Sequence, residues 1–391
     1  MSVLGNTALS FSDDQSMIMD VSRAFCADKS PVSAVRGLLE TDAGFDVAVW
    51  REMVDMGWPG MALPESVGGS GLGVDTVVPV LEAMGRALLG GPLLSTLLAG
   101  QLLLRAAGNG TGLEASSRAG SEPSGFLHDT LSSIAAGAPA TVALLDGADW
   151  GAQTIRCELS GDSTLRGAKQ QVLDAAVAEW FVVVAQQAGE PVLVIVPKVA
   201  IEPAARRDKV LIDATRRAQS VDFTGVLAAD GAVLRGPQVV SALRDVRLLG
   251  ALLLAAEAGG SAASCLNTTV EYLKTRKQFG KLIGSYQALK HPCVDILMAI
   301  DTTRSFVYHA ASLLGSDPLG HDAEVACRMA KAQATETLKH AGDRAVQFHG
   351  GMGFTWECDA QLYVRRAQWV QQAYGDAQHH RKHLAQLLLD R

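Results

Sequence analysis

Helical periodicity dominates the C-terminal part of the chain and limits the folds that it can adopt. Apolar residues recur at helical spacing over residues 241–275, 285–314, 322–348, 359–372 and 377–389. Helices of this length bury their apolar stripes by packing side by side. We therefore predict a bundle of long helices from residue 241 onward.

Two other kinds of sequence come before this bundle. Residues 15–110 show helical patterns interrupted by loops, which predicts an N-terminal helical domain. From residue 140 to 240 the apolar runs are short and β-branched, and Gly, Asp and Pro separate them, as is typical of strands. The runs that we expect to be strands are residues 141–145, 180–185, 191–197 and 210–212.

The composition also suggests where these parts meet. Residues 111–127 are rich in Gly, Ser, Asn and Thr, which favours a flexible connection. We expect a helical domain over residues 1–125, a β-strand domain over 126–240 and the helical bundle over 241–391. The predicted fold class is α+β, mostly α.

Charge and hydrophobicity exclude some classes of partner. The 391 residues are 48% hydrophobic and can bury a large core. Because the formal net charge is −7, the chain as a whole does not attract nucleic acid or an anionic membrane. The longest apolar run, residues 248–258, is far shorter than the roughly 20 residues that span a bilayer. We expect no nucleic-acid partner and no membrane partner.

The cysteines and histidines give no metal signature. No two of the six cysteines have the two-residue spacing of a zinc or dithiol motif. The cluster of His379, His380 and His383 lies near the end of the last predicted helix, where cationic side chains favour the helix dipole. Scattered thiols, and an N-terminus without a basic segment followed by an apolar run, favour a cytoplasmic protein with no bound metal.

The most specific motif lies between the first two bundle helices, where residues 276–280 read RKQFG and Gln287 follows. The guanidinium of Arg276 can pair bidentately with pyrophosphate oxygens. Gln278 supplies an amide, and Phe279 offers a flat apolar surface to an adenosine or flavin ring. This loop is therefore a candidate nucleotide-binding segment.

A glycine cluster near residue 350 is the second candidate. It follows Gln347 and contains Gly350, Gly351 and Gly353, in the order QFHGGMGF over residues 347–354. Glycines carry no side-chain bulk and allow positive φ, so backbone amides can approach a phosphate or a ribose. Two predicted helices separate this cluster from the segment at 276–280.

These two segments, together with a Gly-rich loop at residues 57–72, resemble the acyl-CoA dehydrogenase family from about residue 15 to residue 390. The resemblance implies an N-terminal helical domain, a middle β domain and a C-terminal four-helix bundle. It implies FAD as cofactor, an acyl-CoA thioester as substrate and an acceptor similar to electron-transfer flavoprotein. In that family the segment at 276–280 reaches across a dimer interface to FAD held mainly by the neighbouring subunit.

The family's carboxylate base is missing from its two usual positions. Counting ten positions from Arg365 reaches Tyr374, and the alternative position, thirty residues before Gly280, holds Gly250. Tyrosine has an unperturbed pKa near 10 and is a poor base at neutral pH. Asp376 and Glu257 are the nearest carboxylates in the sequence, and neither is a secure substitute.

The strand that should face the flavin ring is also altered. Where the family has an aromatic and a hydroxyl residue, this chain has Gln171 and Leu173, and Leu173 cannot hydrogen-bond flavin N5. The segment at residues 142–153, which includes Trp150, is shorter than the family's Thr-Glu and Gly-Ser-Asp segment. Groups that serve a neighbour's FAD are thus kept, while groups that hold this chain's own flavin are changed.

The difference predicts a division of labour. We expect the chain to pair with a homologous subunit that carries the base, in a heterodimer or an α2β2 tetramer. The resemblance is closest to the base-lacking subunit of heteromeric bacterial acyl-CoA dehydrogenases, some of which act on steroid side-chain thioesters. One alternative is a self-sufficient homo-oligomer with its base at Asp376 or Glu257. Another is a scaffold without redox activity that binds acyl-CoA or a partner.

Overall fold

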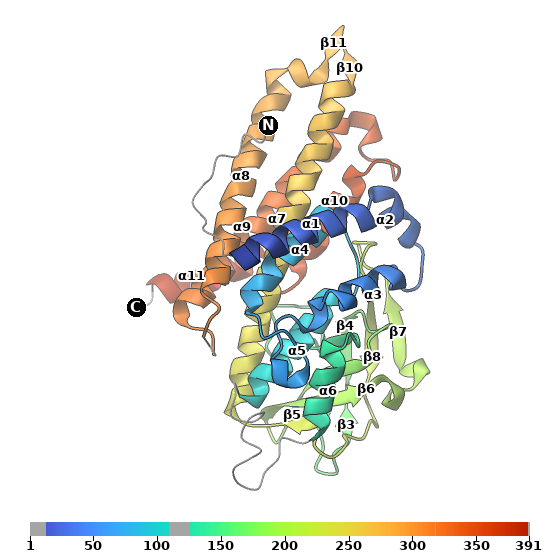
Figure 1. Ribbon diagram of the computed structural model, residues 1–391, viewed down its shortest axis with the longest axis vertical. Coiled ribbons are helices and arrows are strands. Elements are labelled where there is room, and N and C mark those ends of the chain that lie inside the picture. The colour runs from blue at the N-terminus through green and yellow to red at the C-terminus, as the bar shows by residue number, and fades with distance from the viewer. Residues whose placement is uncertain (1–12, 109–124, 317, 390–391) are drawn as a thin grey trace.

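The computed structural model describes residues 13–108, 125–316 and 318–389. Long helices run along one end of the molecule, strands gather at the other end, and the N-terminal helices lie between them on one side (Figure 1). The predicted order of helical domain, β domain and helical bundle is confirmed. Most of the predicted connection at 111–127 falls outside the described residues, so it stays a prediction together with the three domain limits.

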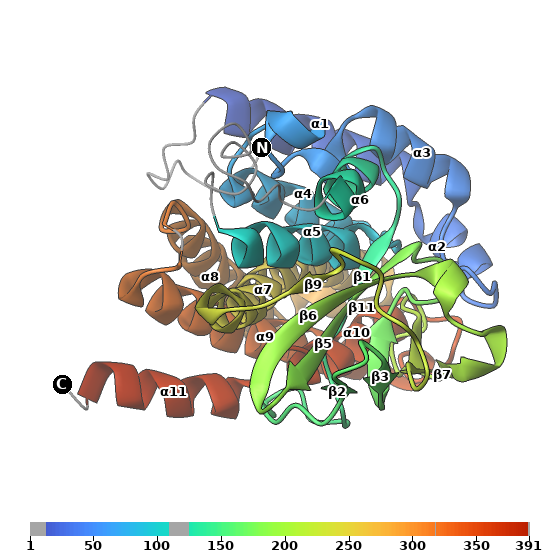
Figure 2. The same ribbon diagram turned by 90° about the horizontal axis from the view of Figure 1, so that it is seen from below.

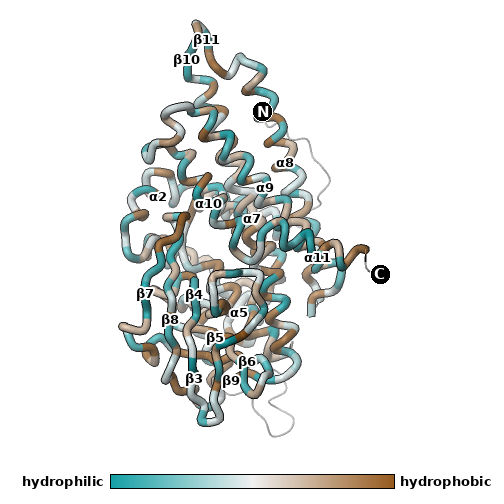
Figure 3. The backbone as a smooth tube through the Cα atoms, turned by 180° about the vertical axis from the view of Figure 1, so that it is seen from behind, coloured by the Kyte–Doolittle hydropathy of each residue, from teal (hydrophilic) through white to brown (hydrophobic). Residues whose placement is uncertain are grey.

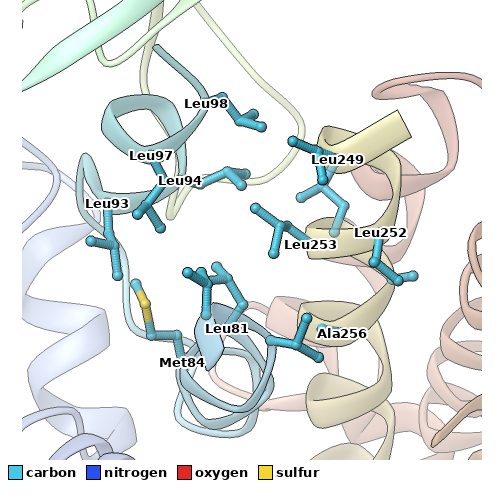
Figure 4. Close-up of a cluster of buried hydrophobic side chains, with 14 of the residues drawn as sticks. Leu81, Met84, Leu93, Leu94, Leu97, Leu98, Leu249, Leu252, Leu253 and Ala256 are labelled. Carbon is cyan, nitrogen blue, oxygen red and sulfur yellow. The ribbon is translucent and has the colours of Figure 1, made fainter. Parts of the chain in front are cut away.

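The N-terminal part is helical and packs against the bundle through α4 and α5. Its α-helices are α1 (Asp13–Lys29), α2 (Val32–Leu38), α3 (Val47–Asp55), α4 (Val77–Arg86), α5 (Leu93–Ala107) and α6 (Gly125–Ala135). Leucines of α4 and α5 meet Leu249, Leu252 and Leu253 of the first bundle helix in one apolar core (Figure 4). A β-carbon at Gly85 or Gly260 would collide with the backbone of the facing helix, so these glycines allow the close approach.

The middle part forms two sheets. Its strands are β1 (Ala140–Ala143), β2 (Glu158–Leu159), β3 (Leu165–Arg166), β4 (Ala168–Leu173), β5 (Trp180–Gln187), β6 (Glu190–Pro197), β7 (Arg206–Lys209), β8 (Ala218–Asp222) and β9 (Val233–Leu234). One sheet has the order β3-β2-β5-β6-β9 with β1 beside β5, and the other has the order β4-β8-β7. In the antiparallel pair β5 and β6, Phe181 lies opposite Val196, and both are buried.

One predicted strand is misplaced. Residues 210–212 do not form a strand, because the chain pairs with β8 over Arg206–Lys209 instead. Val210 and Ile212 follow that strand and are exposed to solvent. The β-branched residues suggested a strand, but the edge strand consists of charged residues.

The C-terminal part is the predicted bundle. Its helices are α7 (Pro237–Thr275), α8 (Gln287–Ser312), α9 (His321–His349), α10 (Ala360–Gln372) and α11 (Ala377–Leu389). A hairpin of β10 (Lys277–Gln278) and β11 (Lys281–Leu282) joins α7 to α8 at the tip of the molecule (Figure 1). α11 extends away from the rest of the chain (Figure 2). Within the described ranges, no helix is both long and apolar enough to cross a membrane.

Candidate functional site

The hairpin at the tip of the bundle places the first predicted motif in solvent. Arg276, Gln278 and Gln287 are exposed, and Phe279 is 84% exposed with a positive φ of 53°. In Figure 3 this hairpin carries both hydrophilic and hydrophobic residues. Among the described residues no acidic side chain forms an ion pair with Arg276. Its guanidinium is therefore available to an anion outside this chain.

The glycine cluster lies beside this hairpin. The ring of Tyr272, one turn before Arg276, stacks on His349 with ring centroids 4.2 Å apart, and Gly350 follows at once. Gly350 has a φ of 62°. A β-carbon at Gly350 or Gly351 would meet nothing within 4 Å, so the backbone here is open to a ligand.

The structure thus brings the predicted cofactor residues to one end of the bundle. We call this set the bundle-end surface: Arg276, Gln278, Phe279, Gln287, Gln347, Gly350 and Gly351. An exposed guanidinium, an exposed aromatic ring and an accessible glycine backbone fit the pyrophosphate and adenosine of a dinucleotide. His349, by contrast, is buried, and its Nδ1 is 2.7 Å from the carbonyl oxygen of Ala345, so it packs inside the bundle.

The two usual base positions lie against each other in the interior. A β-carbon at Gly250 would lie 2.5 to 2.7 Å from three ring carbons of Tyr374. Tyr374 has a positive φ of 58°, which turns its ring toward α7. Burial raises the pKa of this phenol above its ordinary value, so Tyr374 stays protonated and neutral. The phenol ring occupies the space that a side chain at position 250 would need.

Trp150 completes this closure, although the sequence indicated it only as part of a shortened segment. Its ring packs on Tyr374 with centroids 4.6 Å apart, and its Nε1 donates a hydrogen bond of 3.1 Å to Oε1 of Gln171. The space left beside Leu173 and these three residues is a cavity of only about 10 Å³. We call the region of Trp150, Gln171, Leu173, Gly250 and Tyr374 the closed pocket. The small cavity has no room for a flavin ring, while Trp150 and Tyr374 also line a larger cavity.

A larger cavity of about 460 Å³ lies on the other side of Tyr374. Its lining is apolar in part and also includes six side chains from α7, α9 and α11 that can carry a positive charge: Arg244, Arg247, Arg328, His379, His380 and His383. Two of the arginines are already paired, Arg244 with Asp245 at 2.7 Å and Arg328 with Glu324 at 2.6 Å. Burial lowers the pKa of all three histidines, that of His380 to about 2, so they are neutral at pH 7.

The two substitute carboxylates are engaged elsewhere. Glu257 is 1% exposed, contacts Arg216, and lies 3.1 Å from Nη1 of Arg366. It lines neither the closed pocket nor the larger cavity. Oδ1 of Asp376 accepts a 2.7 Å hydrogen bond from the backbone N–H of His379, which makes Asp376 the N-cap of α11.

A buried lysine fixes the turn that carries Tyr374. Nζ of Lys331 donates hydrogen bonds of 2.8 Å to the carbonyl oxygens of Val370 and Gly375. Lys331 is fully buried, and burial lowers its pKa to about 7. Nothing in the sequence singled out this residue, because its partners lie 39 and 44 positions away. Over the residues that the structure describes, no group of His, Cys, Asp and Glu side chains could hold a metal ion.

The fold and these segments define a class of flavoenzyme. Residues 12–110 match the model of the acyl-CoA dehydrogenase N-terminal domain, and residues 244–389 match that of its C-terminal domain. The chain belongs to the acyl-CoA dehydrogenase family, whose members depend on FAD.

Particular relatives are similar over almost the whole length. Acyl-CoA dehydrogenase IpdE2 of Mycolicibacterium smegmatis is 28% identical over 372 residues, 93% of this chain and 95% of that protein. Benzylmalonyl-CoA dehydrogenase of Aromatoleum aromaticum is 27% identical over 92% of this chain and 93% of its own length.

Two solved structures of complexes share the fold. A variant of the steroid acyl-CoA dehydrogenase Tcur3481–Tcur3483 is 25% identical, with a TM-score of 0.78 over 96% of this chain and 98% of its own. The ChsE4–ChsE5 complex of Mycobacterium tuberculosis is 24% identical, with a TM-score of 0.82 over 98% of this chain and 99% of its own.

Proposed function

We propose that this chain is the base-lacking subunit of a heteromeric, FAD-dependent acyl-CoA dehydrogenase. Its bundle-end surface contributes the adenosine and pyrophosphate half of a FAD site to a homologous catalytic partner. The observation that carries the proposal is the contact between Tyr374 and Gly250, because the two positions that hold the family's base are filled by one neutral phenol.

The bundle-end residues have separate roles in this proposal. The Arg276 guanidinium pairs with the pyrophosphate, Gln278 donates an amide hydrogen bond, and Phe279 packs against a ring. The backbone at Gly350 and Gly351 approaches the phosphate or ribose. FAD, when bound, supplies the acceptor for the hydride that leaves the acyl chain, and the partner supplies the base.

The relatives support a heteromer with a bulky substrate. The structures that share this fold include ChsE4–ChsE5 and Tcur3481–Tcur3483, each named for two different chains, and the latter is a steroid acyl-CoA dehydrogenase. We propose a heterodimer or an α2β2 tetramer in the cytoplasm that introduces an α,β double bond into an acyl-CoA thioester in steroid degradation. Its electrons pass to an acceptor similar to electron-transfer flavoprotein.

The self-sufficient homo-oligomer is less well supported. Glu257 is held between Arg216 and Arg366, and Asp376 caps a helix, so neither carboxylate faces a cavity that could hold a thioester beside a flavin. The alternative of a scaffold without redox activity gives no role to the exposed guanidinium of Arg276 or to the accessible glycine backbone.

The test uses conservative substitutions in the complex with the partner. Tyr374→Phe keeps the ring and removes the hydroxyl, and Asp376→Asn keeps the helix cap and removes the charge. We expect both variants to retain the acyl-CoA-dependent dye reduction of the wild-type complex. Replacing the partner's carboxylate base should abolish it. A hundredfold loss with either variant of this chain, while the partner variant stays active, would overturn the proposal.

A further inference from the structure

A second, separate cleft lies between the N-terminal helices and the bundle. It has a volume of about 670 Å³ and is formed by α1, the start of α2 and the end of α4 on one side, and by α7, α8 and α10 on the other. α4 packs against both α1 and α7, and in Figure 1 α1 and α4 lie in front of α7. The cleft shares no lining residue with the closed pocket, the larger cavity or the bundle-end surface.

Three arginines from three helices meet at one end of this cleft. Arg23 of α1, Arg86 of α4 and Arg304 of α8 lie 3.7, 3.2 and 3.8 Å from the carboxylate of Glu82. Burial opposes ionisation of Glu82, but Arg86 and Arg304 outweigh it and hold its pKa below the ordinary value. Among the described residues, Glu82 is one carboxylate beside three guanidinium groups, so positive groups outnumber it at this end of the cleft.

Each of these side chains also reaches solvent. The side chains of Arg23, Arg86 and Arg304 are 36%, 34% and 33% exposed, while that of Glu82 is 7% exposed. Glu82 already accepts a 2.6 Å hydrogen bond from the hydroxyl of Tyr308, so one of its carboxylate oxygens is partly occupied as an acceptor. An anion in the cleft can therefore meet guanidinium donors from more than one helix.

The rest of the lining suits an organic body attached to that anion. Among the described residues the lining contains no carboxylate. One wall consists of small apolar side chains, Ala27, Pro31, Val32, Ala83 and Ala87. The facing wall is polar and includes Asn267, Thr268, and Tyr363, whose hydroxyl donates a 3.1 Å hydrogen bond to Oγ of Ser264. The volume lies within the roughly 300 to 1,000 Å³ of typical small-molecule sites.

We propose that this cleft binds a small organic phosphate of about nucleotide size. The phosphate lies at the end with Arg23, Arg86 and Arg304, and the body of the ligand lies between the apolar wall and the polar wall. Arginine forks match phosphate oxygens bidentately, whereas inorganic phosphate would leave most of the cleft unfilled. This inference does not depend on the proposed dehydrogenase role, because the cleft shares no residue with the FAD-binding segments.

The binding test distinguishes the contribution of the phosphate group from that of the organic part of the ligand. AMP, adenosine and inorganic phosphate are titrated calorimetrically into the full-length chain that carries Arg276→Ala, which removes the arginine of the bundle-end surface. We expect AMP to bind at least about tenfold more tightly than adenosine, because charge-assisted hydrogen bonds are the stronger ones. AMP should also bind more tightly than inorganic phosphate. Equal affinity for AMP and adenosine, or no AMP binding, would overturn the proposal.

Variants then locate the site. Arg23→Gln and Arg86→Gln should each weaken AMP binding by roughly tenfold to a hundredfold. Ala27→Trp should block the cleft without a change in charge, and because Ala27 is exposed this variant should still fold. Arg51→Gln, on an exposed part of α3 outside the cleft, is the matched control and should bind like the parent. Binding of AMP that survives both Arg23→Gln and Ala27→Trp would contradict this assignment.

Discussion

The bundle-end surface and the closed pocket are built from motifs of one family, but they differ in what they offer to a ligand. At the bundle end, Arg276 and Phe279 point into solvent and the backbone at Gly350 is accessible. In the closed pocket, Trp150 and Tyr374 pack on each other and leave about 10 Å³. Under the proposed function, the surface that would serve a partner's cofactor exposes polar groups, and the cavity beside Trp150 and Tyr374 is too small for a flavin ring.

If the proposed function holds, this contrast is what a subunit with half of a shared site would show. Aromatic rings that fill a pocket add packing and need no ligand for stability. An exposed arginine and an exposed phenylalanine contribute little to the stability of a lone chain, so their retention is better explained by what they bind. Four predictions test the two regions and the buried groups near them.

The first prediction concerns the buried carboxylate of Glu257. Glu257→Ala should lower the free energy of unfolding by about 3 to 5 kcal/mol, because it leaves Arg216 and Arg366 buried without their shared anion. Denaturant unfolding monitored by circular dichroism measures the change. Glu336→Ala, which breaks an exposed pair with Arg381, is the control and should cost about 1 kcal/mol or less. A Glu257→Ala variant as stable as the control would show that this carboxylate is free for another role.

The second prediction concerns the bundle end. Arg276→Ala in the complex with the partner should weaken FAD binding by roughly tenfold to a hundredfold, since it removes charge-assisted hydrogen bonds to the pyrophosphate. Ultrafiltration followed by flavin absorbance measures the retained FAD. Lys274→Ala is the matched control, because it removes a positive charge two residues before Arg276. Lys274 already pairs with Glu271, so this variant should retain FAD like the wild type. If both variants lost FAD equally, Arg276 would contribute only its positive charge and no specific contact with the pyrophosphate.

The third prediction concerns the contact inside the closed pocket. Gly250→Ala should destabilise the chain by about 1 to 3 kcal/mol, because the new methyl group overlaps the Tyr374 ring. Adding Tyr374→Ala to this variant should recover part of the loss, which a double-mutant cycle measures by thermal unfolding. Gly37→Ala in α2 is the control, because a β-carbon there meets nothing within 4 Å. If Gly250→Ala behaved like Gly37→Ala, the closed pocket would have more space than its side chains indicate.

The fourth prediction uses the pH dependence of the turn that carries Tyr374. Folding lowers the pKa of Lys331 from its ordinary value of 10.5 to about 7, so between these values the unfolded chain binds more protons. Stability from this group therefore rises with pH over that window, by at most about 1.4 kcal/mol per pH unit. Lys331→Met should remove this rise, which is measured as the difference in unfolding free energy between variant and wild type from pH 7 to 10. An unchanged difference across that range would mean that Lys331 titrates as an ordinary lysine.

Much of the fold could be predicted from the sequence because its helices are long and strongly periodic. The predicted segment 359–372 corresponds to α10 at Ala360–Gln372, and the predicted last segment coincides with α11 at Ala377–Leu389. The strand predicted at 210–212 was wrong because strand formation there depends on pairing with β8, and the pairing falls on Arg206–Lys209.

The site was predictable only where its residues are close in sequence. Arg276, Gln278 and Phe279 form one hairpin, so their spacing alone indicated a surface. The closure of the pocket could not be predicted from the sequence. Trp150 and Tyr374 are 224 positions apart, and no local sequence pattern indicates that their rings are in contact. The same holds for Glu257, whose arginine partners lie in the β domain and in α10.

The absorbance spectrum and native mass of the purified chain, alone and copurified with its homologous partner, test the central claim most directly. The account predicts a colourless chain that becomes part of a yellow complex with one FAD per pair of homologous subunits. A yellow homo-oligomer with one FAD per chain that oxidises acyl-CoA without a partner would contradict it.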